Sequence, residues 1–472
     1  MSKSWFEVDR EGLRELQAGK HKGFIIRELV QNAWDENIKS CAINMFYDHK
    51  RANIEITDDA PDGFKDIRDA YTLFRHTSKR ANPHQRGRFN LGEKQVLALA
   101  QEATITTTKG KVRFTQSGRT EFNSHYGRKE GSVVQLIVPM TYDEYLEMEE
   151  YAKHLLVPRG ISYTVHGEPI EHREPLKVFT ANLQTEIEGT DGVLRRSMRN
   201  TEVQIFDRNG SAILYEMGLP VQEIDCDYSI NVLQKVPLSL DREAVLPAYL
   251  RDVYAEVLNA MHDTLTEERA SEGWVREATM DERVSSEAMK DVIRERYGEK
   301  VVVANPFDAR ANDDALAAGY RVIRGSEMSK EEWDNVRRDG LIESSSQVFS
   351  RNYENATSVS PDLHMQRVQR LAQTIAHDFL GIHIQVQFLK APGASISADF
   401  NGEILRFNVS NLGKSFFKEE LNISILDLII HELGHSAGMH MDMSYHNCIT
   451  KLGAELTIKA INDPEYFKKV ME

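Results

Sequence analysis

Residues 23–39 read GFIIRELVQNAWDENIK, and this stretch decides the fold of the first part of the chain. Its large apolar residues recur at the spacing of an α-helix. Three polar residues, Glu28, Asn32 and Asp35, follow one another at i, i+4 and i+7, so they share one face of that helix. The opposite face carries Ile26, Val30 and Ala33. The stretch therefore predicts an amphipathic helix with a stripe of carboxylate, amide and carboxylate groups.

Short runs of alternating apolar and polar residues follow this helix, each bounded by polar or glycine-containing turns. They lie at 42–46, 53–57, 103–108, 112–115 and 132–139. Alternation with a period of two is typical of half-buried strands. Strands that alternate with an amphipathic helix predict an α/β sandwich for this part of the chain.

Two loops in the predicted sandwich have the composition of a nucleotide site. In 58–64, DDAPDGF, a carboxylate followed by a turn can accept the exocyclic amine of adenine, and a glycine lets the ring approach the backbone. In 87–94, GRFNLGEK, a glycine-containing loop precedes a short helix, whose first N–H groups and positive dipole end suit phosphates. A loop with two glycines also serves as a plain turn, so neither loop is specific on its own.

Composition limits the classes of protein to which the chain can belong. Its 472 residues predict about three domains. It has no apolar run of roughly 18 residues, and its start, MSKSWFEVDREG, lacks the apolar core of a secretory signal. The three cysteines are widely scattered, which favours a reducing compartment. We expect a cytoplasmic protein without a membrane partner.

The charge of the chain bears on its partners. A net charge of −15 argues against a nucleic-acid binder that uses its whole surface. A local basic cluster could still face phosphate, and a nucleotide is the expected partner for it: Arg75, Lys79, Arg80, Arg86 and Arg88.

The rest of the chain divides into three further parts. A second unit from residue 141 is expected to contain a helix at 144–156, strands at 161–165 and 203–206, and a closing helix at 248–265. A charged stretch at 266–300 predicts a solvated helical connector, followed by a small βαβ-like insert that begins at 301–305. The last unit is expected to contain helices at 365–380, 421–435 and 445–460 and strands at 383–389 and 404–409.

The pentad HELGH at residues 431–435 predicts a metal centre in the last unit. A helix brings His431 and His435 to the same face, about 6 Å apart, while Glu432 can act on a bound water. Two histidines packed near a core are the alternative, but they would leave Glu432 half-buried without a charge partner. The third ligand stays open between four residues, of which His440 is preferred and Glu455 is the main alternative: His440, Asp442, His446 and Glu455.

Five segments of the first part together resemble the successive motifs of the GHKL ATPases: ELVQNAWDE (28–36), ITDDAPDGF (56–64), RHTSK (75–79), GRFNLGEK (87–94) and EGSVVQL (130–136). The resemblance implies that Glu28 is the general base, Asn32 the Mg²⁺ ligand and Asp58 the reader of adenine. It implies a further group of residues around the nucleotide: Asp35, Gly63, Lys79, Gly87, Gly92, Lys94 and Ser132, the last where the family usually has threonine. Two departures from the family pattern are Ala60, in place of a glycine, and Asn90, in place of the middle glycine of the lid.

The second unit resembles the ribosomal-protein-like transducer α/β domain that follows the ATPase domain in gyrase B and MutL. In that resemblance Lys235 is the lysine that reaches back to the γ-phosphate; the alternative is an ordinary surface lysine. A transducer also implies that ATP closes two subunits into a homodimer.

The last unit resembles a small zincin. His440 lies one residue nearer to His435 than the third ligand of metzincins, and Glu455 has the separation found in gluzincins of the thermolysin type. The stretch 405–413, LRFNVSNLG, resembles the edge strand on which small zincins hold an extended substrate, and a structural strand is the alternative. The joined modules resemble proteins of phages and mobile elements, which places the protein in the host cytoplasm.

The sequence thus predicts an α+β multidomain protein with four parts. These are a GHKL ATP-binding domain (1–140), a transducer-like domain (141–265), a connector with its insert (266–350) and a zincin-like metallopeptidase domain (351–472). Its expected function is an ATPase whose nucleotide-driven movement gates zinc-dependent cleavage of a protein substrate, with ATP, Mg²⁺ and Zn²⁺ as cofactors. The alternative is a GHKL clamp or scaffold, near nucleic acid, with a structural or partner-binding zinc module.

Overall fold

The computed structural model describes residues 8–64, 66–75, 78–189, 191–239, 244–305, 309–349, 356–392, 394, 396–418, 421–438, 440 and 443–471. The chain forms a mixed α+β structure with two compact units. Unit 1 comprises 1–261 and 272–278, and unit 2 comprises 262–271 and 279–472. Over the residues described, none of the helices combines the length and the apolar character that a crossing of the bilayer requires.

Unit 1 begins with an eight-stranded sheet, here called sheet A, in the order β5-β4-β3-β6-β2-β1-β7-β8. Its neighbouring strands are antiparallel except for the parallel pair β1 and β7. The strand bounds are β1 Ser40–Asp48, β2 Arg51–Asp58, β3 Glu102–Thr107, β4 Gly110–Thr115, β5 Gly118–Phe122, β6 Val133–Pro139, β7 Ser162–Val165 and β8 Glu168–Pro169. The five strands predicted from alternation are confirmed as β1, β2, β3, β4 and β6.

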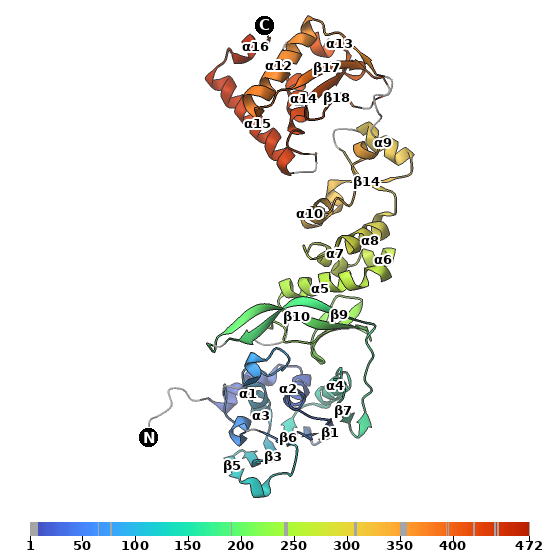
Figure 1. The fold of residues 1–472 in the computed structure, drawn as a ribbon. Coiled ribbons are helices and arrows are strands. Elements are labelled where there is room, and N and C mark those ends of the chain that lie inside the picture. Colours follow the sequence, from blue (N-terminus) through green and yellow to red (C-terminus); the bar gives the residue numbers. More distant parts are fainter. Residues whose placement is uncertain are drawn as a thin grey trace. The chain divides into compact units, whose positions relative to one another are not determined.

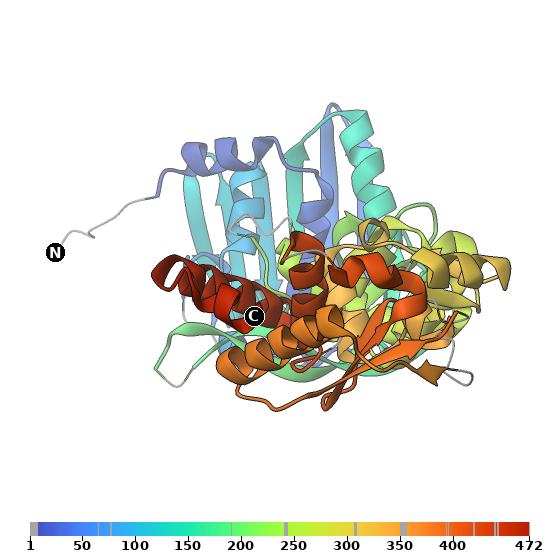
Figure 2. The ribbon, with the colours of Figure 1, turned by 90° about the horizontal axis from the view of Figure 1, so that it is seen from above.

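Four helices cover one face of sheet A (Figure 1). They are α1 Arg10–Ala18, α2 Gly23–Trp34, α3 Gly92–Leu99 and α4 Tyr142–Lys153. Seen from above, the blue to cyan strands run side by side with these helices over them (Figure 2). The predicted amphipathic helix is confirmed as α2, whose apolar residues Ile25, Ile26 and Val30 are fully buried in the core between the two layers. Short 3-10 helices lie in the connections: η1 Ile67–Ala70, η2 Ser78–Ala81 and η3 Ser124–Tyr126.

A second sheet, sheet B, completes unit 1, with five strands in the order β12-β11-β13-β10-β9. The bounds are β9 Lys177–Glu188, β10 Leu194–Asp207, β11 Ala212–Glu216, β12 Leu219–Ile224 and β13 Tyr228–Val232. Helix α5, Pro247–Met261, packs on β9, and α2 contacts β12 (Figure 1). Sheet B therefore adjoins the helix whose polar stripe was predicted to meet a nucleotide.

The boundary expected at residue 140 does not separate the two sheets. Strand β7 pairs with β1 through Cys41 and Tyr163, and α4 packs against α2. Sheet A therefore extends to Pro169. Pairing between strands about 120 residues apart leaves no local pattern in the sequence, which is why the boundary was placed too early.

The charged stretch 266–300 is helical, as predicted, but only partly solvated. It contains α6 Glu267–Ala270, α7 Gly273–Thr279 and α8 Ser286–Tyr297, after η4 His262–Thr264. Trp274 of α7 is buried and lies edge-on to Tyr228 and Tyr254. The prediction of a wholly solvated connector is wrong because this aromatic ring belongs to the core of unit 1.

The predicted βαβ insert is confirmed in unit 2. Strands β14 Val301–Val303 and β15 Arg321–Ile323 are parallel, with α9 Ala309–Ala317 between them in the chain. Two further helices follow, α10 Lys330–Arg338 and α11 Ser345–Phe349, with η5 Gly325–Glu327 before them. Ser329 caps α10 through a reciprocal pair of hydrogen bonds with Glu332, which fixes the start of this helix.

The last part of unit 2 is a four-stranded sheet, in the order β16-β17-β19-β18, packed with helices. The strands are β16 Thr357–Ser358, β17 Gln385–Lys390, β18 Ala398–Phe400 and β19 Ile404–Asn408. The helices are α12 Leu363–Leu380, α13 Val409–Lys418, α14 Ile423–Gly434, α15 Met443–Asn462 and α16 Tyr466–Met471. The helices and strands predicted here from periodicity are confirmed as α12, α14, α15, β17 and β19.

Of the two alternatives for the stretch 405–413, the structural strand is confirmed for residues 405–408 and the edge strand is wrong. Strand β19 pairs with β17 on one side and with β18 on the other, and from Val409 onward the chain is helical. The edges of this sheet are β16 and β18, and β18 contacts α14. The three residues of β18 are too few to show a period of two, so the sequence could not reveal them.

Candidate functional sites

Unit 1 contains a cavity of about 310 Å³ between α2, the ends of β2 and β6, and the loop that precedes α3. Eight of the residues that the family resemblances place at the nucleotide line it: Glu28, Asn32, Asp58, Gly63, Lys79, Gly87, Gly92 and Ser132. Three others of that set are not in its lining: Asp35, Lys94 and Lys235. Of the remaining basic cluster, Arg75 and Arg88 line the cavity, and Arg80 and Arg86 do not. His76 and Thr77 of the RHTSK motif lie outside the described residues. Side chains from five sequence motifs thus meet around one space.

Asp58 is held at one end of the cavity by the backbone. Its Oδ1 accepts hydrogen bonds from the N–H groups of Ala60, at 2.9 Å, and Ser132, at 3.1 Å. Burial raises the pKa of Asp58, although both N–H groups favour the ionised form. Because Oδ1 is fixed in this way, Oδ2 is the oxygen that can accept from a bound base.

Gly63 is required by its surroundings. Its φ of +56° is strained for other residues, and a Cβ there would lie 2.7 Å from the hydroxyl oxygen of Thr107. The glycine therefore keeps the turn close to β3 beside the cavity. This reason differs from the approach of an adenine ring expected for it, which stays a prediction.

Glu28 is buried on α2, next to the cavity. Its Oε1 lies 3.2 Å from Nη2 of Arg27. Its Oε2 lies against Gly92, where any Cβ would overlap the carboxylate. Gly92 is thus needed for the packing of Glu28, a reason that differs from the phosphate contact expected for it.

The loop at Gly87 is organised by Asp35. The N–H groups of Arg86 and Gly87 donate to the two carboxylate oxygens of Asp35, at 2.8 and 2.7 Å. Asp35 follows the last residue of α2, so its side chain turns toward this loop and away from the cavity. Lys79 does line the cavity, and its Nζ lies 2.7 Å from Glu36.

Lys94 does not reach the cavity. Its buried Nζ donates to the backbone oxygen of Asp69 and to Oδ1 of Asn90, the latter at 3.0 Å. Its neighbour Glu93 lines the cavity instead, and burial raises the pKa of that carboxyl. The motif alone did not show which of the two residues faces inward.

Lys235 is neither in the cavity nor on the surface. It is 1% exposed, and its Nζ donates to the backbone oxygens of Lys79, at 2.5 Å, and Arg80, at 3.3 Å. The side chain of Lys235 therefore has neither of the two placements expected from the sequence, at the γ-phosphate or on the surface. Lys235 ties sheet B to the segment that carries the cavity lysine Lys79.

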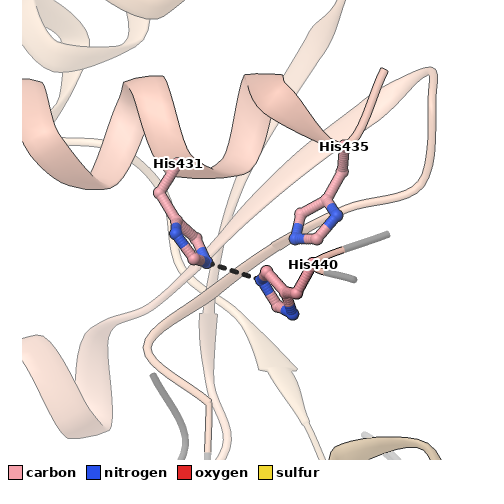
Figure 3. Close-up of side chains that lie close together, drawn as sticks. All are labelled: His431, His435 and His440. Carbon is pink, nitrogen blue, oxygen red and sulfur yellow. Dashed lines mark hydrogen bonds between the residues drawn. The ribbon is translucent and has the colours of Figure 1, made fainter. Parts of the chain in front are cut away.

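Unit 2 contains one group of side chains, among those the structure describes, that could hold a metal ion: His431, His435 and His440. One ligand atom from each lies within 4.8 Å of the others. The Nε2 atoms of His431 and His440 are 3.0 Å apart. Figure 3 shows the three rings converging on one point.

The positions of the rings follow from helix α14 and the turn after it. His431 lies in the helix and His435 caps its C-terminus, so one turn separates them. Gly434 lets the helix pack against Tyr445 and Ile449 of α15, since a Cβ there would come within 2.8 Å of the tyrosine ring. The chain then turns back through Gly438 and brings His440 to the same place.

Hydrogen bonds at Nδ1 leave Nε2 of these rings available. Nδ1 of His435 lies 3.1 Å from the oxygen of Gly438, which can only accept, so Nδ1 carries the proton. The hydroxyl of Tyr445 lies 2.8 Å from Nδ1 of His431 and 3.3 Å from the oxygen of His431. Burial, and then the neighbouring imidazoles, lower the pKa of His431 and of His440 to about 4. Neutral rings are the form that binds metals.

Glu432 is buried beside this group. Burial, and then the charge of Asp399 on β18, raise the pKa of Glu432 to about 8. Across the described residues it forms no ion pair with a lysine, arginine or histidine.

The other candidate ligands are not in the group. Glu455 lies 3.7 Å from Lys451 on the same helix, and His446 is exposed. Asp442 lies outside the described residues. Two neighbours of the group were missed by the sequence analysis, Tyr445 and Asn305. Tyr445 could have been suspected, because it lies on the buried face of the helix that follows the pentad. Nothing in the sequence near Asn305 indicates a contact with the pentad.

Similarity to known proteins is low. No protein-family model matches the chain, and no curated protein matches it. Part of the chain is similar to a solved structure, the ATPase region of topoisomerase II from Saccharomyces cerevisiae, with a TM-score of 0.29 and 12% identity. The similarity covers 44% of this chain and 72% of that chain. Both candidate sites are therefore interpreted from their own geometry.

Proposed function

We propose that this chain joins an ATPase in unit 1 to a zinc-dependent peptidase in unit 2. The observation that carries the second activity is the convergence of His431, His435 and His440 beside the buried carboxylate of Glu432. The observation that carries the first is the cavity in which Asp58, Asn32 and Glu28 meet.

The donor set in unit 2 fits zinc. Neutral imidazoles suit Zn²⁺, and three protein ligands with one open position are typical of catalytic zinc. Tetrahedral ligands about 2.0–2.1 Å from zinc lie roughly 3.3 Å from one another, close to the 3.0 Å between Nε2 of His431 and of His440. A structural zinc would need a fourth protein ligand, whereas the group found among the described residues has three members. These three imidazoles match the number of protein ligands at a catalytic zinc, and this match is the reason for proposing a peptidase.

Zinc held by these rings would supply Lewis acidity to a peptide carbonyl. That cation would also favour the ionised form of Glu432, whose carboxylate would take one proton from the water that attacks the carbonyl carbon and pass it to the leaving amine nitrogen as the C–N bond breaks. One peptide and one water thus give one carboxylic acid and one amine, and transfer of the acid proton to the amine leaves a carboxylate and an ammonium group. Strand β18, at the edge of its sheet and in contact with α14, offers backbone groups to an extended substrate.

In unit 1, the proposed roles follow the places of the side chains. Asp58 accepts the exocyclic amine of adenine, and Asn32 offers its amide oxygen to Mg²⁺. Glu28 takes the proton of the water that attacks the γ-phosphate, so that ATP and water give ADP and phosphate. A volume of about 310 Å³ is at the lower end of the range for ligand cavities.

The remaining expectations are part of the same proposal. ATP closes two chains into a homodimer, and this movement controls access of a protein substrate to unit 2. The protein acts in the cytoplasm.

Two conservative variants test the two activities separately. Glu432→Gln should keep one zinc per chain and lose cleavage of a protein substrate, and undiminished cleavage would reject the role given to Glu432. Glu28→Ala should bind ATP and lose turnover. Hydrolysis at the wild-type rate would show that the base is another residue.

A further inference from the structure

The three imidazoles differ in how firmly the backbone holds them. His431 and His435 belong to α14 and its cap, whereas His440 lies in the turn that follows. A side chain in a turn needs a tertiary contact to keep one orientation. The structure provides such contacts from residues that are not members of the metal group.

Asn305 is the neighbour of His440. It follows β14 of the insert, is 4% exposed, and places Nδ2 3.4 Å from Nδ1 of His440. Asn305 is itself firmly held, because its N–H donates to Oδ1 of Asn312 at 2.9 Å and its C=O accepts from Nδ2 of Asn312 at 2.7 Å. Nδ2 of Asn305 also donates to the hydroxyl of Ser346 at 2.8 Å. The insert thus presents a pre-oriented amide to His440.

The two ends of this amide are interchangeable by a half-turn about its last bond. After that turn, Oδ1 stands where the Ser346 hydroxyl and an Nδ1 proton of His440 can both donate to it. With the proton on Nδ1, the lone pair of Nε2 in His440 points at the other two rings.

Tyr445 contacts His431 in the same way as Asn305 contacts His440, at the Nδ1 atom of the imidazole. Its side chain is fully buried, and its hydroxyl can accept the Nδ1 proton of His431, at 2.8 Å, while it donates to the oxygen of the same residue, at 3.3 Å. Its ring also packs against all three imidazoles, with centroid separations of 4.9 to 5.9 Å.

We propose that Asn305 and Tyr445 are positioning residues of the metal centre, each accepting the Nδ1 proton of one imidazole and so presenting its Nε2 to a divalent cation. The insert at 301–349 is then part of the metal centre. This inference rests on the proposed zinc site and names residues that touch its ligands but not the metal.

The test measures zinc affinity of the full chain by competition with a chromophoric chelator. Tyr445→Phe removes only the hydroxyl, and Asn305→Leu removes the acceptor at similar volume. Each should lower zinc affinity by about 10- to 100-fold, the usual effect of losing a partner of a ligating histidine. Asn305→Asp keeps an acceptor for both Ser346 and His440, so it should stay near the wild-type affinity. Tyr466→Phe, which removes a hydroxyl bonded to Asp378 elsewhere in unit 2, should have no effect.

A second readout separates positioning from general stability. Thermal unfolding of each variant is measured without zinc and with zinc. A purely structural role would lower both melting temperatures equally and leave the affinity unchanged, and this result would overturn the inference. It would also be overturned if Asn305→Asp bound zinc as weakly as Asn305→Leu. A wild-type chain that binds no zinc would instead reject the proposed metal site, and the inference with it.

Discussion

Nη2 of Arg88 lies 2.9 Å from each carboxylate oxygen of Glu216, and both side chains are buried. Arg88 belongs to the loop beside the nucleotide cavity, and Glu216 ends β11 of sheet B. The same Nη2 donates to the oxygen of Val236 at 2.8 Å. The loop and sheet B are therefore joined by a charged contact that water does not reach.

Breaking this pair should be costly. Arg88→Met leaves the Glu216 carboxylate buried without its guanidinium partner, which should lower the free energy of unfolding by about 3–5 kcal/mol. Urea unfolding followed by circular dichroism measures the change. The double variant Arg88→Met with Glu216→Met removes both charges and should recover much of the loss. Equal stability of the single and double variants would show that the pair is not coupled.

Gly92→Ala should impair ATP hydrolysis while the chain stays folded. The new methyl group would overlap the Glu28 carboxylate and displace it. A displacement of about 1 Å at a catalytic group costs on the order of a hundredfold in rate. Gly19→Ala is the matched control, because a Cβ at Gly19 meets no atom within 4 Å. Wild-type turnover in Gly92→Ala would mean that Glu28 is not the base.

Asp58→Asn should weaken ATP binding by roughly tenfold to a hundredfold, because an amide can present N–H groups where the amine of adenine needs an acceptor. Asp59→Asn serves as the control. Asp59 accepts from the N–H groups of Lys39 and Ser40, at 2.9 and 3.0 Å, and is not in the cavity lining. Isothermal titration calorimetry gives both affinities, and an equal loss in the two variants would contradict the role of Asp58.

Replacement of the third imidazole should abolish zinc binding. His440→Ala leaves two ligands, so zinc retained after gel filtration should fall from about one per chain to nearly none. His446→Ala and Glu455→Ala should retain the metal, because neither side chain belongs to the group of three. If Glu455→Ala lost zinc and His440→Ala kept it, the alternative ligand of the sequence analysis would be the correct one.

Thiol reagents should discriminate between the three cysteines. Burial raises the pKa of Cys41 and of Cys226 to about 12, so only about one thiol in 10,000 is the reactive thiolate at pH 8. Cys448 is half-buried and should react first. Mass spectrometry after brief alkylation of the native chain should find the label on Cys448, and after denaturation on all three. Rapid native labelling of Cys41 would show that the layer between α2 and sheet A opens readily.

The sequence by itself determined the local elements and the pairs of residues that one helix carries. Glu28 and Asn32 share a face of α2, and His431 and His435 share a face of α14, because the hydrogen bonds of an α-helix fix the spacing of residues four apart. Asp58 and Gly63 were also recognisable from the sequence, because the features of a turn are local. Asp58 accepts a hydrogen bond from the backbone N–H of Ala60, two residues on, and Gly63 adopts a positive φ. Eight of the residues that line the cavity could therefore be named in advance.

The tertiary structure alone decided which distant residues meet. The sequence left four candidates for the third metal ligand, and the turn after α14 brings His440 to that position. The sequence also placed Lys94 and Lys235 at phosphates, but both side chains donate to backbone oxygens of other segments. It gave no sign that Asn305 of the insert lies beside His440, or that β7 extends sheet A next to β1. These contacts join residues far apart in the chain, and their stability comes from burial and hydrogen bonding between surfaces that no short stretch of sequence describes.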